Sequence, residues 1–144
     1  MRSGLEVLVI YVDEHLVELR IQASNGEFAA QASVYANRDA PTNLAQTLRG
    51  FPAKSGDSRE FQLGTFRSDE GGDGVQLRFY CTDAAGHAAV DVRVETKKPG
   101  RAGSHGWMAT FDIPVEAAAV DAFVEQLARM RTAVGERAEL VSTT

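Results

Sequence analysis

Apolar and polar side chains alternate with a period of two along most of this chain, which is the pattern of a half-buried β-strand. The clearest case flanks Asn25-Gly26, where both neighbouring runs alternate. Asn and Gly tolerate the left-handed backbone of a type I′ turn, so this dipeptide favours a two-residue hairpin. Such a turn would place Ala23 opposite Phe28, with the apolar residues of both strands on one face.

Further alternating runs predict further strands. They cover residues 61–65, 75–81, 90–94 and 107–113, and the apolar run Leu5–Val12 is interpreted as an added edge strand. A four-residue connection at Asp83–Gly86 would join two of them as a hairpin, with Arg78 facing Asp91 across the strands.

The period changes to three or four in two places. Residues 41–50 predict a short helix, because Pro41 suits a first turn and Gly50 a stop. A longer helix is predicted to be capped by Asp112, to hold Pro114 in its first turn and to end near Gly135. Residues 136–144 are expected to form a partly disordered tail. Together these elements predict one α+β domain over residues 1–144: an antiparallel sheet of five to six hairpin-linked strands with two helices packed on one face.

Composition limits the classes of partner. The formal net charge of −5 argues against nucleic-acid binding, which needs a basic face. The most apolar run, Val7–Val12, is too short to span a bilayer, so no membrane partner is expected. Cys81 is the single cysteine and allows no internal disulfide, which fits a reducing compartment. We therefore expect a cytoplasmic protein that is a monomer or a homodimer.

The sequence predicts no metal site. Asp69–Gly74 reads DEGGDG, but as an EF-hand loop it would have Gly71 at the third ligand position and Tyr80 at the twelfth. It also lies between two β-runs, so we interpret it as a turn. The histidines, which are His15, His87 and His105, lack the spacing of metal ligands to one another or to the cysteine.

The sequence also predicts no cofactor and no catalytic residue. The basic loop Lys97–Gly106 could hold an anion, although a solvated loop explains its composition as well. Cys81 alternates with apolar residues, so it is interpreted as a small buried hydrophobe and not as a nucleophile. Asp91 and Glu95 lie on one strand face, where a polar sheet surface accounts for them without acid–base chemistry. We expect a protein that is not an enzyme.

The outward face of the sheet is the strongest candidate for a binding surface. Mixed charges together with tyrosine and arginine are the residue types that recognise other proteins. The predicted partner-binding residues are Arg20, Gln31, Arg78, Tyr80, Asp91, Arg93 and Glu95. The competing interpretation is an ordinary solvated sheet face.

The order of these pieces resembles that of the WapI-type bacterial immunity proteins and related uncharacterised small domains. The resemblance covers roughly residues 16–131 and is carried by the segments ELRIQASNGEFAAQASVY, TNLAQTLRGFP and FDIPVEAAAVDAFVEQLARM. It implies an α+β fold and a protein that neutralises a toxin by binding it, and it brings no catalytic residues. The run Leu5–Val12 departs from the family pattern.

Three hypotheses of function follow. The first is a non-enzymatic protein-binding domain, with a toxin domain as a candidate partner. The second is a small ligand-binding domain or enzyme with a pocket between sheet and helices. The third is a domain that associates with itself through Leu5–Val12 or through the open sheet face.

Overall fold

The computed structural model describes residues 2–66, 73–97 and 106–142. Within these ranges the chain forms eight strands and two helices, so the predicted α+β class is confirmed. The strands are β1 (Gly4–Val12), β2 (Leu16–Ser24), β3 (Ala29–Asn37), β4 (Ser58–Gly64), β5 (Gly74–Cys81), β6 (Ala88–Thr96), β7 (Trp107–Val115) and β8 (Arg137–Val141). The helices are α1 (Ala40–Leu48) and α2 (Ala117–Arg129).

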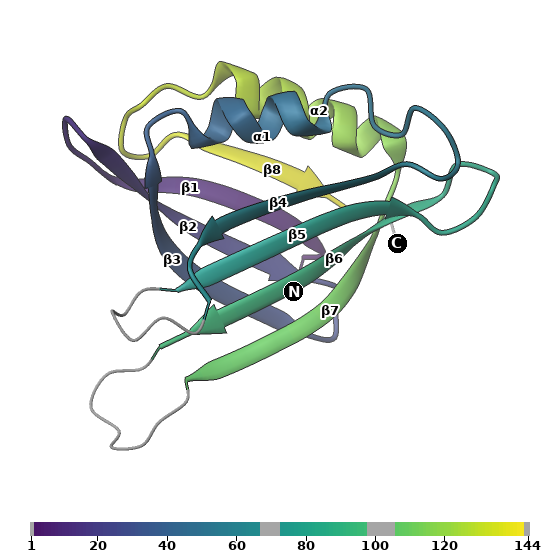
Figure 1. Cartoon of the computed structure of the whole chain (residues 1–144), viewed down its shortest axis with the longest axis horizontal. Helices are drawn as coiled ribbons and strands as arrows, with labels where there is room; N and C mark the ends of the chain where they lie inside the picture. The colour runs from purple at the N-terminus through teal and green to yellow at the C-terminus, as the bar shows by residue number, and fades with distance from the viewer. Residues whose placement is uncertain (1, 67–72, 98–105, 143–144) are drawn as a thin grey trace.

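The strands form two antiparallel sheets of four strands, and the prediction of a single sheet of five to six strands was wrong. Sheet A has the order β3-β2-β1-β8 and sheet B the order β4-β5-β6-β7 (Figure 1). Alternation identifies strands and local hairpins, but it carries no information on which distant strands pair. Here α1 separates the two sheets in the chain, and β8 returns from the C-terminal end to pair with β1.

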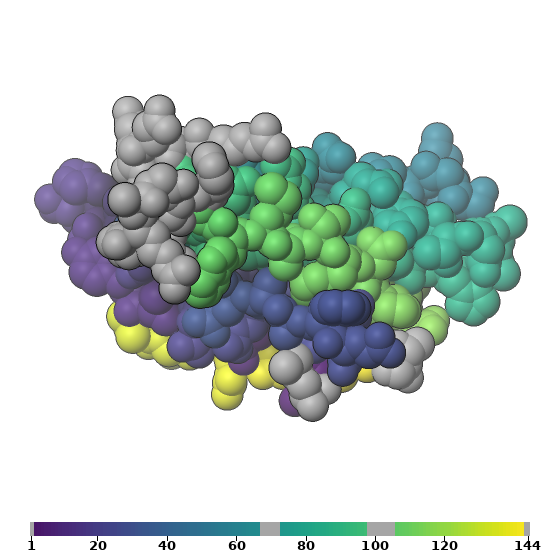
Figure 2. Space-filling view, turned by 90° about the horizontal axis from the view of Figure 1, so that it is seen from below, coloured from purple at the N-terminus to yellow at the C-terminus, as the bar shows by residue number. Residues whose placement is uncertain are grey.

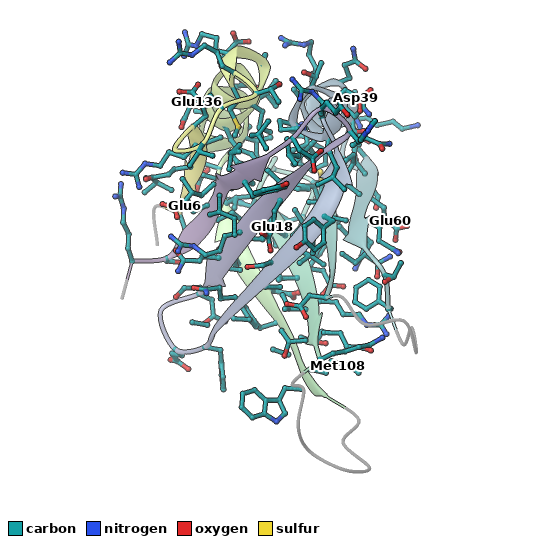
Figure 3. All side chains as sticks on the ribbon, turned by 90° about the vertical axis from the view of Figure 1, so that its left-hand side faces the viewer. Glu6, Glu18, Asp39, Glu60, Met108 and Glu136 are labelled. Atoms are coloured by element: carbon teal, nitrogen blue, oxygen red, sulfur yellow. The ribbon has the colours of Figure 1, made fainter. Side chains whose placement is uncertain are left out.

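The two helices pack against each other where the sheets diverge. α2 contacts β8 at the edge of sheet A, and α1 contacts β4 at the edge of sheet B (Figure 1). Their apolar sides share one core with the inner faces of both sheets, in which Phe51, Phe79 and Phe123 are fully buried. The helices therefore close the gap between two sheets and do not cover one face of a single sheet. The outer face of each sheet stays clear of them (Figure 1 and Figure 3).

The first and the last strand of the described residues both belong to sheet A. Residues 5–12, which were expected at an edge, lie within β1 between β2 and β8. The tail expected to be partly disordered contains β8, with Ala138 and Leu140 buried against the core. Two inward apolar residues separated by Glu139 give too short an alternation to identify a strand from the sequence.

The β2–β3 hairpin has a wider turn than predicted. Ser24 pairs with Ala29 and Ala23 with Ala30, so Phe28 lies in the turn and is exposed. The side-chain oxygen of Asn25 accepts the backbone N–H groups of Glu27 at 3.0 Å and Phe28 at 2.8 Å. This Asx-type bonding outweighs the two-residue turn preference of Asn-Gly. The register shift is two residues, so the predicted inward face is kept.

The β5–β6 hairpin has the predicted register. Arg78 pairs with Asp91 and Gln76 with Arg93. Thr82 donates its N–H to the His87 carbonyl at 2.8 Å, which closes the four-residue turn, and Gly86 supplies the positive φ of 94°.

The short helix lies close to its predicted position, whereas the longer one starts later than predicted. Pro114 belongs to β7, not to a helical first turn, and α2 begins at Ala117. α2 ends at Arg129, so the exposed Val134 lies beyond it. Proline suits both a first helical turn and an edge strand, and here the edge strand prevails because β7 pairs only with β6.

Candidate partner-binding surface

The seven predicted residues do not share one surface. Arg20 and Gln31 lie on β2 and β3 of sheet A. The other five lie on sheet B, with Arg78 and Tyr80 on β5 and Asp91, Arg93 and Glu95 on β6. The single-face prediction was wrong because alternation places each residue outward on its strand without saying which sheet the strand joins.

The outer face of sheet B carries cross-strand rows of polar side chains. One row runs through Glu60, Arg78, Asp91 and Asp112, from β4 to β7. Three acids and one base in this row give it a net negative charge. The row lies on four neighbouring strands, so the backbone fixes the spacing of these side chains.

Arg78 is held between two neighbours on this face. Its guanidinium carbon lies 4.4 Å from the centroid of the Tyr80 ring, and its Nη2 lies 3.6 Å from Oδ2 of Asp91. The cation–π contact and the ion pair together restrict the rotamers of a long side chain. The side chain of Arg78 is still 38% exposed, so its outer surface remains open to contact.

Tyr80 connects this group to β7. Its hydroxyl donates to Oδ2 of Asp112 at 2.8 Å. Burial, the hydrogen bond to Asp112 and the charge of that carboxylate raise the pKa of Tyr80, so the phenol stays protonated as a donor. Asp112 was interpreted from the sequence as a helix cap, and its place in this network follows from its position on β7.

The side chains of Arg93 and Glu95 are less exposed than that of Arg78. Arg93 lies over the Phe66 ring at 4.5 Å, and its Nη2 is 3.8 Å from Oε2 of Glu95. The Glu95 residue is only 4% exposed. It was predicted as an outward contact residue, but its burial leaves little of it available to a partner.

A separate cavity of about 670 Å³, lined by both polar and apolar residues, lies on sheet A near the end that holds Gly4 and Ser24. Arg137 lines it and lies 3.0 Å from a carboxylate oxygen of Glu6 and 3.5 Å from one of Glu139. Gln22 and the predicted residue Gln31 line it too, and the amide of Gln22 donates to Gln31 at 2.6 Å. The cavity therefore offers both hydrogen-bond donors and hydrogen-bond acceptors. The sequence did not indicate it, because the cavity depends on the pairing of β1 with β8.

The histidines and the cysteine that the sequence analysis considered do not form a common site in the described residues. His15 contacts Glu14 at 3.1 Å and His87 contacts Asp83 at 2.6 Å, each at the protein surface. Among residues 2–66, 73–97 and 106–142, no three His, Cys, Asp or Glu side chains form a group that could hold a metal ion. Cys81 is half-buried rather than buried, and its Sγ lies 3.6 Å from the Lys54 carbonyl oxygen.

Parts of two predicted loops lie outside the described residues. These are residues 69–72 of the DEGGDG segment and residues 98–105 of the basic loop, which include His105. The described Asp73 accepts the N–H of Ser33 at 3.2 Å and of Lys97 at 3.1 Å. Its carboxylate thus links the edge of sheet A to the end of β6.

No helix within the described part of the chain has the length and apolar character needed to cross a membrane. Comparison of the chain with protein-family models, curated proteins and solved structures finds no match.

Proposed function

We propose that this chain is a non-enzymatic protein-binding domain that holds its partner on the outer face of sheet B. The observation that carries the proposal is the fixed position of Arg78 between the Tyr80 ring and the Asp91 carboxylate. Side chains that are already ordered lose less conformational entropy when a partner binds. Arginine and tyrosine are also the residues in which binding free energy tends to concentrate.

The charge of this face supports a partner with a basic surface. The row on sheet B holds Glu60, Asp91 and Asp112 against Arg78, and the whole chain carries a formal charge of −5. A basic protein would be drawn to such a face during encounter. A toxin domain is the partner that the resemblance to the WapI-type immunity proteins implies, and binding alone would neutralise it.

The cavity on sheet A favours a second candidate function, the binding of a small polar ligand. Arg137 could contact an acidic group of such a ligand, and the amides of Gln22 and Gln31 could fix its orientation. This cavity lies on a sheet surface, whereas the earlier hypothesis placed a pocket between sheet and helices.

The experiment compares two outward arginines on the two sheets. Wild type, Arg78→Glu and Arg20→Glu are immobilised, and proteins retained from an extract of the native cell are quantified by mass spectrometry. We expect one basic protein to be retained in near-stoichiometric amount by wild type and Arg20→Glu, and at least about tenfold less by Arg78→Glu. Thermal melts confirm that both variants fold.

Equal retention by all three proteins, or no retained protein, would contradict the proposal. If only Arg20→Glu retains less of the protein than wild type, the interface lies on sheet A. If the retained protein is a toxin, its co-expression with wild type should restore growth, and co-expression with Arg78→Glu should not.

A further inference from the structure

β7 is an edge strand whose two halves differ. Its C-terminal half is closed by two side chains that directly follow strands of sheet A. Nδ2 of Asn25, just after β2, donates to the Asp112 carbonyl at 3.2 Å, and Oγ of Ser142, just after β8, donates to the Pro114 carbonyl at 2.5 Å. These two carbonyls therefore point away from β6. Since N–H and C=O of one residue point to the same side of an antiparallel strand, the backbone groups of Met108 and Thr110 point away from β6 too.

The stretch Met108–Thr110 of this edge is open within the described residues. Within residues 2–66, 73–97 and 106–142, the N–H and C=O groups of Met108 and Thr110 make no hydrogen bond to another strand or loop. Residues 107–111 read WMATF and carry no charge, while Trp107 and Met108 are 57% and 55% exposed. β7 crosses the middle of the face seen from below in Figure 2, and Met108 lies at the end of the molecule remote from the helices (Figure 3).

The other edges carry protection that this segment lacks. The side-chain amide of Gln126 bonds both backbone groups of Glu139 on β8, at 2.9 and 3.0 Å. Asp73 accepts the N–H of Ser33 on β3, and β4 carries the charged residues Arg59 and Glu60. Soluble proteins guard sheet edges in these ways, because an uncharged open edge is a template for another strand.

We propose that an extended segment of the protein partner pairs with β7 along Met108–Thr110 and so adds a strand to sheet B. This inference rests on the proposed function and specifies how the partner is held. Pairing would use the outward N–H and C=O groups of Met108 and Thr110, as in recognition by strand addition. The closed half of β7 limits the paired stretch to these residues.

The surroundings of the edge define the chemistry of that segment. Asp112 stands directly opposite Asp91, an arrangement of like charges that is unfavourable, and its contact with Tyr80 is to a neutral hydroxyl. A lysine or arginine of the segment beside Asp112 would offset this repulsion. Apolar side chains beside Met108 would cover its exposed surface. The segment is therefore extended, apolar in its middle and basic at one end.

The decisive substitution is Thr110→Pro. It removes the outward N–H and places ring carbons where the partner backbone would lie, but it removes no bond to β6. Pro114 already occupies an equivalent outward position on this strand. Thr110→Ala is the matched control, because it changes the side chain and keeps the N–H. Thermal melts of both variants check folding.

The probe is a displayed library of random twelve-residue peptides, selected on the full wild-type chain. We expect selected peptides that carry a basic residue at one end, bind Thr110→Ala like wild type and bind Thr110→Pro at least about tenfold more weakly. In the complex, the amides of Met108 and Thr110 should become protected from hydrogen exchange, whereas in the free chain they exchange rapidly.

Three results would overturn the inference. One is a failure to select peptides, another is equal binding to Thr110→Pro and Thr110→Ala, and the third is a wild-type dimer that Thr110→Pro makes monomeric. Peptides that depend on Arg78 but not on Thr110 would support the proposed function while removing this edge from it. Peptides that depend on Thr110 but not on Arg78 would support strand addition at β7 and would contradict binding through the outer face of sheet B.

Discussion

The carboxylate of Asp73 accepts the backbone N–H of Ser33 at 3.2 Å, across the junction between the two sheets. Its other oxygen accepts the N–H of Lys97 at 3.1 Å, just after β6 ends. Ser33 lies on the outer edge of sheet A, so this N–H has no neighbouring strand to bond. One acidic side chain therefore satisfies donors from both sheets and fixes the corner at which they meet.

Replacement of Asp73 by Ala should destabilise the protein by about 1–3 kcal/mol, because two partly buried N–H groups would lose a charged acceptor. Asp73→Asn should lie between wild type and Ala, since an amide keeps one acceptor oxygen. Urea unfolding followed by circular dichroism measures the free energy of unfolding. Asp121→Ala, on the exposed side of α2, is the control and should change it by less than about 0.5 kcal/mol. If the Asp73 and Asp121 substitutions change the free energy of unfolding equally, the contacts of Asp73 do not stabilise the fold measurably.

The hairpin β5–β6 shows what the sequence could predict. Its turn is local, and only one register matches Arg78 with Asp91 and Gln76 with Arg93. The five predicted site residues on these two strands therefore share a face, as expected. Arg20 and Gln31 belong to a different hairpin, and no local signal says whether two hairpins lie in one sheet or in two.

Long-range pairing explains most of what could not be predicted. β8 pairs with β1 from the opposite end of the chain, so nothing near Arg137 in the sequence indicates its partner. The cavity beside Glu6 exists only because of that pairing. Asp112 was missed for a different reason: proline two residues later suits a helix start and an edge strand equally well.

Gln126 on α2 takes the place of a neighbouring strand for β8. Its amide oxygen accepts the N–H of Glu139 at 2.9 Å, and its amide nitrogen donates to the Glu139 carbonyl at 3.0 Å. Gln126→Ala should cost about 1–3 kcal/mol, because two hydrogen bonds of about 0.5–1.5 kcal/mol each are lost. It should also increase aggregation near the midpoint of unfolding, since the edge of β8 is opened.

Two further variants, Gln126→Glu and Gln46→Ala, are compared with Gln126→Ala. Urea unfolding measures the free energy of unfolding of each variant, and light scattering measures its aggregation. The glutamate variant keeps the acceptor but cannot donate, so its loss of stability should be at least half that of the alanine variant. Gln46 is exposed on α1 and serves as the control for replacing a helical glutamine. If Gln126→Ala behaves like Gln46→Ala, the helix protects β8 by covering it and not by hydrogen bonding.

His87 and Asp83 contact each other across the β5–β6 turn, with Nδ1 of His87 2.6 Å from Oδ2 of Asp83, and they form an ion pair when the ring is protonated. The hydrogen bond and the charge of Asp83 raise the pKa of His87 above its ordinary value of 6.5. The same hydrogen bond, together with backbone N–H donors, lowers the pKa of Asp83 below its ordinary 3.8. The contribution of His87 is full below pH 6.5 and is lost as the pH rises through its raised pKa. That of Asp83 is full above pH 3.8 and is lost as the pH falls through its lowered pKa.

The pair should therefore stabilise the fold most between pH 3.8 and 6.5. His87→Gln removes the titrating ring and leaves the Asp83 bonds to the backbone in place, so the melting temperature difference from wild type should be largest in that window and shrink at higher pH. In wild type, the His87 ring protons observed by NMR should titrate above pH 6.5, and in Asp83→Asn at lower pH. A melting temperature difference that stays constant from pH 4 to pH 9 would show that the contact at 2.6 Å carries no charge-dependent stability.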